Sequence, residues 1–83
     1  MKFIKLIKTK YFGPTNTRGA RIKACSDCGK TITIGWDYSL DQKHNALNAA
    51  ESLIEKEKLA VEITGIGSFE SEYFITIKFK ERN

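Results

Sequence analysis

YFGPTNTRGARIKA, residues 11–24, decides how the rest of the chain is arranged, because an irregular loop gives way there to a regular strand. Pro14 is the only proline, and it has no N–H to donate to a sheet ladder, so the strand before it must end. Residues 15–17 carry hydroxyl and amide groups that hydrogen-bond readily to nearby backbone, which is typical of a compact turn. We therefore expect a loop that ends at Gly19 and a strand that follows it.

The sequence predicts a β-hairpin over residues 20–38, where side chains alternate on both sides of a turn at residues 26–29. Asp27 and Gly29 suit that turn, since Gly29 tolerates positive φ. The side chains expected on the core face are Ala20, Ile22, Ala24, Ile32, Ile34, Trp36 and Tyr38. Those expected on the opposite face are Arg21, Lys23, Cys25, Thr31 and Thr33.

Residues 2–12 predict an earlier strand whose two faces both contain lysine. One face carries Lys5, Ile7 and Thr9, and the other carries Lys8 and Lys10. Lysine on a strand discourages edge-to-edge aggregation, so we expect this strand to lie partly at an edge of the sheet.

Residues 41–58 predict the only long helix, with leucine, isoleucine and alanine at three- to four-residue spacing. Either Ser39 or Asp41 can cap its N-terminus, and Ser39 with Gln42 matches a capping box. The side chains expected to be buried are Leu40, Ala46, Leu47, Ala50, Leu53 and Ile54.

Two strands are expected after the helix, over residues 61–67 and 72–80. The last strand alternates, with Tyr73, Ile75, Ile77 and Phe79 expected toward the core. The predicted fold is α+β: a single domain of residues 1–83 with a small, mostly antiparallel sheet, elements in the order β-β-β-α-β-β, and one helix packed on one face.

The charge is divided unevenly along the chain. The net charge is +4, but residues 1–30 carry eight cationic side chains against one anionic side chain. A basic region of this kind attracts phosphates or acidic proteins, and solubility alone is the alternative explanation. The apolar runs are too short for a membrane span, and the N-terminal residues lack the continuous apolar stretch of a signal peptide. We therefore expect a cytoplasmic protein without a membrane partner.

A sheet with one helix leaves its other face uncovered, and cations, hydroxyls and an aromatic ring are expected there. This combination is typical of nucleic-acid platforms, in which cations neutralise phosphate and aromatics stack on bases. An ordinary solvated sheet face is the alternative, because threonine and lysine are common on such faces. With Arg18 from the preceding loop, the candidate nucleic-acid-binding residues are Arg18, Arg21, Lys23, Thr31, Thr33, Phe74, Lys78 and Lys80.

The loop over residues 15–19 is a second candidate site, because a glycine-flanked turn can aim backbone amides at an anion. It is not a P-loop, and residues 29–31 lack the earlier glycine and the following helix that such a loop needs. We interpret residues 15–17 as structural and Arg18 as the functional candidate.

Cys25 and Cys28 form a CxxC pair in the hairpin turn. Such a pair supplies half of a zinc site, but zinc prefers four ligands and only His44 remains as another strong ligand. A zinc shared between two copies and a turn with two reduced thiols are the alternatives, and we expect the turn, with no metal. No arrangement of nucleophile, base or paired carboxylates predicts catalysis, so we expect neither an enzyme nor a cofactor.

The chain resembles a group of short uncharacterised proteins of bacteriophages, plasmids and integrated elements. The resemblance lies in the run YFGPTNTRGARIKA, in TITIGWDYSL after it, and in the helix with His44 and residues 49–51. Those proteins carry a Tyr-x-x-x-Thr-x-Thr-Arg-Gly-x-Arg-Ile-Lys-Ala run, and the match covers roughly residues 9–55. The resemblance implies a mobile-element accessory protein, without an assigned activity.

We therefore expect a small non-enzymatic protein that binds nucleic acid through a basic sheet face. One alternative is an inhibitor that binds a host protein, as counter-defence proteins such as anti-CRISPRs do, for example at an acidic surface. Another alternative is a self-associating domain, in which an exposed sheet or edge pairs with a second copy to form a homodimer.

Overall fold

The computed structural model of the chain describes residues 5–27, 29–70 and 72–79. The elements along the chain are β1 (Lys5–Phe12), β2 (Arg21–Ser26), β3 (Thr31–Gly35), α1 (Gln42–Lys56), β4 (Val61–Phe69) and β5 (Glu72–Phe79). The five strands form one sheet in which every neighbouring pair is antiparallel. The predicted α+β class and the order of elements along the chain are confirmed.

The spatial order of the strands is β3-β2-β1-β5-β4, which differs from their order along the chain. β1 is therefore the central strand, hydrogen-bonded to β2 on one side and to β5 on the other. The prediction that β1 lies partly at an edge was wrong. Lysine marks a solvated face as well as an exposed edge, and Lys8 and Lys10 lie on such a face.

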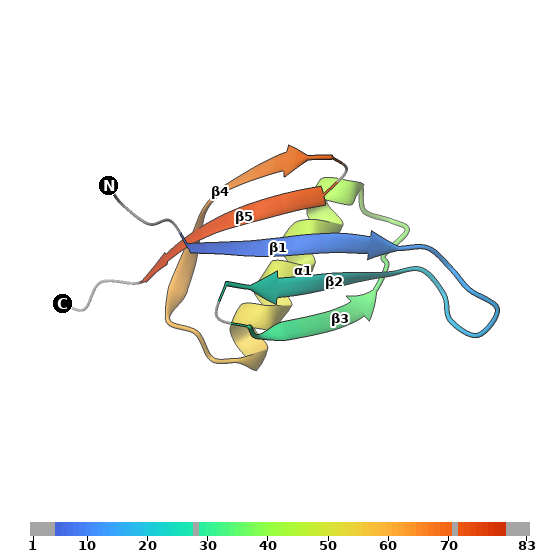
Figure 1. The fold of residues 1–83 in the computed structure, drawn as a ribbon, viewed down its shortest axis with the longest axis horizontal. Helices are drawn as coiled ribbons and strands as arrows, with labels where there is room; N and C mark the ends of the chain where they lie inside the picture. The colour runs from blue at the N-terminus through green and yellow to red at the C-terminus, as the bar shows by residue number, and fades with distance from the viewer. Residues whose placement is uncertain (1–4, 28, 71, 80–83) are drawn as a thin grey trace.

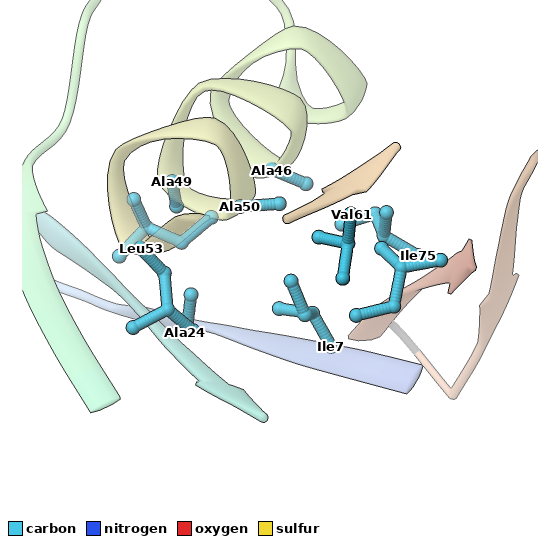
Figure 2. Packing of buried hydrophobic residues seen from close by; sticks show 10 residues of the cluster. Ile7, Ala24, Ala46, Ala49, Ala50, Leu53, Val61 and Ile75 are labelled. Carbon is cyan, nitrogen blue, oxygen red and sulfur yellow. The ribbon is translucent and has the colours of Figure 1, made fainter. Parts of the chain in front are cut away.

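The single helix lies across one face of the sheet, where it contacts β1, β2, β3 and β5 (Figure 1). Its inner surface is made largely of alanine, and these small side chains allow the helix to approach the strands closely (Figure 2). The buried core is formed by Ile7, Ile22, Ala24, Ala46, Ala49, Ala50, Leu53, Val61, Ile75 and Ile77. The other face has no helix in the described part of the chain.

The helix is one to two residues shorter at each end than predicted, and both of its ends are capped. Asp41 is the N-cap, and its carboxylate accepts a hydrogen bond of 2.8 Å from the backbone N–H of His44. The predicted capping box is wrong, because the N–H and hydroxyl of Ser39 both donate to Asp37 instead. At the C-terminus Lys58 has a φ of 52°, and the N–H of Leu59 donates back to the Ile54 carbonyl, as in a Schellman motif.

Three predicted core positions are exposed. Tyr38 lies in the turn after β3 and is 78% exposed, and Leu40 precedes the helix rather than joining its buried stripe. Phe79, at the end of β5, is 60% exposed, and the Lys5 ammonium lies 5.0 Å from the centre of its ring. Conversely, the polar side chain of Asn45 on α1 is fully buried.

The β4–β5 hairpin is longer than the glycines of β4 suggested, because β4 continues to Phe69. A β-bulge between Ile63 and Gly65 accommodates one extra residue. No helix in the described residues is long and apolar enough to span a membrane.

Candidate functional site

The side of the sheet opposite α1, called here the helix-free face, is built from alternate residues of the strands. The pairing register places on it Leu6, Lys8, Lys10, Phe12, Arg21, Lys23, Cys25, Thr31, Thr33, Phe74, Thr76 and Lys78. Figure 1 views the molecule from this side, with α1 behind the strands. Six of the eight predicted binding residues lie on this face; Arg18 lies in the β1–β2 loop, and Lys80 lies outside the described residues.

Three unpaired cations gather on two neighbouring strands, and we call Lys10, Arg21 and Lys23 the cationic cluster. Lys10 and Lys23 are directly opposite each other in the β1–β2 ladder. Like charges at opposed positions destabilise a sheet. Within residues 5–27, 29–70 and 72–79, no carboxylate forms an ion pair with any of the three.

Phe12 is the aromatic centre of the cationic cluster. It pairs directly with Arg21, whose guanidinium carbon lies 5.3 Å from the ring centroid. The Lys10 ammonium lies 5.7 Å from the same centroid. Cation–π contacts at these distances attract the cations to the ring but leave their full positive charge in place.

An open hollow of about 310 Å³ lies over β1 and β2 beside this ring. It is lined by Lys8, Lys10, Phe12, Lys23 and Cys25. A second hollow of about 260 Å³ adjoins it and is lined by Leu6, Lys8, Cys25, Ser26, Asp27 and Phe74. Lys8 and Cys25 belong to both linings, so the two hollows lie side by side on the face.

Two other cations on this face, Lys8 beside the cationic cluster and Lys78 near the other end of the sheet, form ion pairs. Lys78 lies 3.1 Å from a Glu62 oxygen, and Lys8 lies 3.3 Å from a Glu72 oxygen. Lys78 also lies far from the cationic cluster. Its neighbour Thr76 pairs with Leu6, whereas Arg21 pairs with Phe12, so Lys78 and Arg21 are more than about 20 Å apart along the strands.

The Arg21 side chain has an unsatisfied donor. Arg21 is half-buried, and its Nη1 atom is buried without a hydrogen-bond partner in the described part of the chain. A buried donor of a charged group without an acceptor is unfavourable by a few kcal/mol in typical proteins, about 1–3 or more. Across the ladder from Arg21 stands Gly35, which has no side chain to accept the bond.

The loop between β1 and β2 projects beyond the end of the sheet (Figure 1). The hydroxyl of Thr15 accepts hydrogen bonds from the N–H groups of Thr17 and Arg18, at 3.4 and 3.0 Å. The Thr15 N–H donates to the Arg18 carbonyl at 2.7 Å. The expectation of a turn stabilised by hydroxyl-to-backbone bonds is therefore confirmed, and the exposed Arg18 side chain stands next to it.

The cysteine pair is described only in part, because Cys28 lies outside the described residues. Cys25 is a free, half-buried thiol on the helix-free face. No three histidine, cysteine or acidic side chains of residues 5–27, 29–70 and 72–79 come together in a metal-binding group. His44 is exposed, and its Nδ1 lies 2.6 Å from an Asp41 oxygen at the start of α1.

Another open hollow, of about 190 Å³, lies beside the start of α1 and is lined by Tyr11, Trp36 and Gln42. The Tyr11 and Trp36 rings meet edge to face, with centroids 4.7 Å apart. Trp36 also packs against the core, as expected of it from the sequence. The lining carries no charged side chain, so the helix-free face is the better candidate site.

The sequence alone missed Phe12 and the opposition of Lys10 to Lys23. Alternation already placed Lys8 and Lys10 together on one face of β1. Alternation does not indicate which strands are neighbours in the sheet. Only the register of β1 against β2 brings Lys10 and Phe12 close to Lys23. No family model, curated protein or solved structure matches the chain, so the resemblance to mobile-element proteins stays a prediction.

Proposed function

We propose that this protein is a non-enzymatic binding protein that holds nucleic acid on its helix-free face. Lys10 and Lys23 are the main phosphate contacts in this proposal, Arg21 adds a third, and Arg18 extends the surface into the β1–β2 loop. Phe74 lines the second hollow and supplies an aromatic contact, and Thr31 and Thr33, opposite Cys25 and Lys23 in the β2–β3 ladder, supply hydroxyl contacts. Lys78 has a lesser role, because Glu62 already neutralises it.

The observation that carries the proposal is the direct opposition of Lys10 and Lys23, neither of which forms an ion pair with a carboxylate of residues 5–27, 29–70 or 72–79. The repulsion between them lowers stability in the free protein. A phosphate backbone placed between the two ammonium groups removes this repulsion and releases the counterions of the nucleic acid. Binding a polyanion is therefore more favourable in free energy on this surface than on a sheet face whose cations already form ion pairs.

A titration at several salt concentrations tests the proposal. The protein is titrated against labelled single-stranded and double-stranded DNA and RNA, and log Kd is plotted against log salt concentration. Each phosphate contact that is removed lowers the slope by about one. We expect Lys10→Glu/Lys23→Glu to lose most of the affinity for every sequence and to flatten this plot.

Lys78→Glu is the matched control, because it reverses a charge on the same face but within an existing ion pair. It should bind within a few-fold of the unaltered protein. Absence of binding at low salt, or equal loss in the Lys78 and Lys10/Lys23 variants, contradicts the proposal. An acidic protein surface is the other class of ligand that suits these cations. Recovery of a partner from nuclease-treated host lysate, without any nucleic-acid binding, indicates a host-factor inhibitor instead.

A further inference from the structure

The cationic cluster is compact and belongs to two strands only. Lys10 and Lys23 form one cross-strand row, and Phe12 and Arg21 form the next. Neighbouring strands lie about 4.8 Å apart and successive rows on one face about 6.6 Å apart. The unpaired charge is thus a patch about one nucleic-acid backbone wide. The other two lysines of this face that the structure describes form ion pairs, Lys8 with Glu72 and Lys78 with Glu62.

This width favours a single strand over a duplex. The two backbones of a duplex border grooves about 6–12 Å wide, so contacts to both need cations spread over a broader area. A single strand needs one line of cations and access to its bases, and the open hollow beside Phe12 offers such access. The line of cations formed by the cationic cluster continues past Arg21 toward the projecting loop that carries Arg18 (Figure 1).

The open surface over Gly35 is a candidate position for one phosphate of a strand that runs along β1 and β2. A Cβ atom added to Gly35 meets no atom within 4 Å, so the surface beside Arg21 is open there. Gly35 is directly opposite Arg21, whose buried Nη1 has no acceptor among the described residues. An acceptor above Gly35 gives the guanidinium a partner when it turns outward from Phe12, and a phosphate matches its forked donors.

We propose that the helix-free face takes single-stranded nucleic acid along β1 and β2, with one phosphate seated over Gly35 on the Arg21 guanidinium. The inference rests on the proposed function, because it specifies the form of the ligand and its position on the same face. Lys10 and Lys23 hold the neighbouring phosphate, and the strand continues toward Arg18. The absence of a side chain at position 35 keeps the seat open.

Two glycine substitutions that leave every charge in place test this position. Gly35→Thr places a side chain over the seat, whereas Gly67→Thr adds the same side chain to the same face at the other edge of the sheet. Gly67 is opposite Phe74, and a Cβ there also meets no atom within 4 Å. Threonine favours strands, so both variants should melt at or above the temperature of the unaltered protein.

The probes are a labelled oligothymidylate of about 12 nucleotides and a duplex of equal length at low salt. We expect the single strand to bind more tightly than the duplex. We expect Gly35→Thr to weaken its binding by about tenfold or more, and Gly67→Thr to leave it within about twofold. If Gly35→Thr melts at a lower temperature, Gly35→Ala provides the same comparison with a smaller side chain.

The outcomes separate this inference from the proposed function. Tight binding by Gly35→Thr, together with loss in Lys10→Glu/Lys23→Glu, overturns the seat at Gly35 but keeps the function. Equal loss of affinity in Gly35→Thr and Gly67→Thr also overturns the phosphate position at Gly35. Preference for the duplex overturns the single-strand assignment. If the unaltered protein binds neither probe, the proposed function fails and the inference fails with it.

Discussion

Asn45 illustrates how one buried polar side chain organises a connection. Its Oδ1 accepts a hydrogen bond from the Asp37 N–H at 2.9 Å. Its amide group donates to the carbonyls of Asp37, Leu40 and Asp41 at 3.0, 3.2 and 3.0 Å. These bonds hold the loop between β3 and α1 against the first turn of the helix. They explain why an asparagine is fully buried inside an otherwise apolar helix face.

Replacing Asn45 by alanine should destabilise the protein by about 2–4 kcal/mol, because buried backbone groups of the loop lose their partners. Asn48→Ala is the control, since Asn48 is exposed on the same helix, and it should change stability by less than about 0.5 kcal/mol. Urea denaturation of the two variants measures the difference. Equal stability of the two variants is incompatible with this role for Asn45.

At the scale of the element, the start of α1 depends on an ionised carboxylate. The pKa of Asp41 is held below its ordinary value of 3.8, first by the hydrogen bond from the His44 backbone N–H and then by the His44 side chain. Between the two pKa values the unfolded chain binds more protons than the native one. The stabilisation is therefore complete above the ordinary value and is lost as the pH falls through the native pKa.

Asp41→Asn separates the cap from its charge, because asparagine caps helices but does not titrate near this pH. We expect the variant to be slightly less stable than the unaltered protein near pH 6, since a negative charge favours the helix N-terminus. That difference should shrink as the pH falls to about 3. Urea denaturation over this pH range measures it. A difference that stays constant with pH contradicts the assigned role of the Asp41 carboxylate.

The elements show what the sequence can predict and where it stops. Period-two alternation identified the strands and the face on which Arg21 and Lys23 lie, because a strand's own side chains decide its faces. The capping aspartate was one of two candidates, and only the hydrogen bonds distinguish Asp41 from Ser39. The central place of β1 depends on pairing between distant strands, and local alternation does not encode such pairing. The Lys10–Lys23 opposition was unpredictable for the same reason.

At the scale of the whole molecule, the fold is a two-layer structure with one buried interface. Ile7 and Leu6 are neighbours in β1, but Ile7 is fully buried under α1 while Leu6 lies on the helix-free face and is 36% exposed. Burial against the helix thus accounts for most of the stability that β1 can supply through its side chains.

Truncating these two neighbours measures the difference between the faces. We expect Ile7→Ala to lower the free energy of unfolding by about 3 kcal/mol, because it leaves a cavity between sheet and helix. Leu6→Ala should lower it by less than about 1 kcal/mol. Chemical denaturation of both variants provides the comparison. Similar losses at the two positions indicate that the face carrying Leu6 is also covered.

The pairing of β1 with β5 has a consequence for the newly made chain. The hydroxyl of Thr9 donates to the carbonyl of Tyr73, a contact between residues 64 positions apart. While the ribosome is still adding the residues between them, β1 has one edge without a partner, and an unpaired edge is prone to aggregation. Lys8 and Lys10 are two residues apart in that unpaired strand. We therefore expect these two lysines, one of them the proposed phosphate contact Lys10, to discourage self-association of the unfinished chain during synthesis.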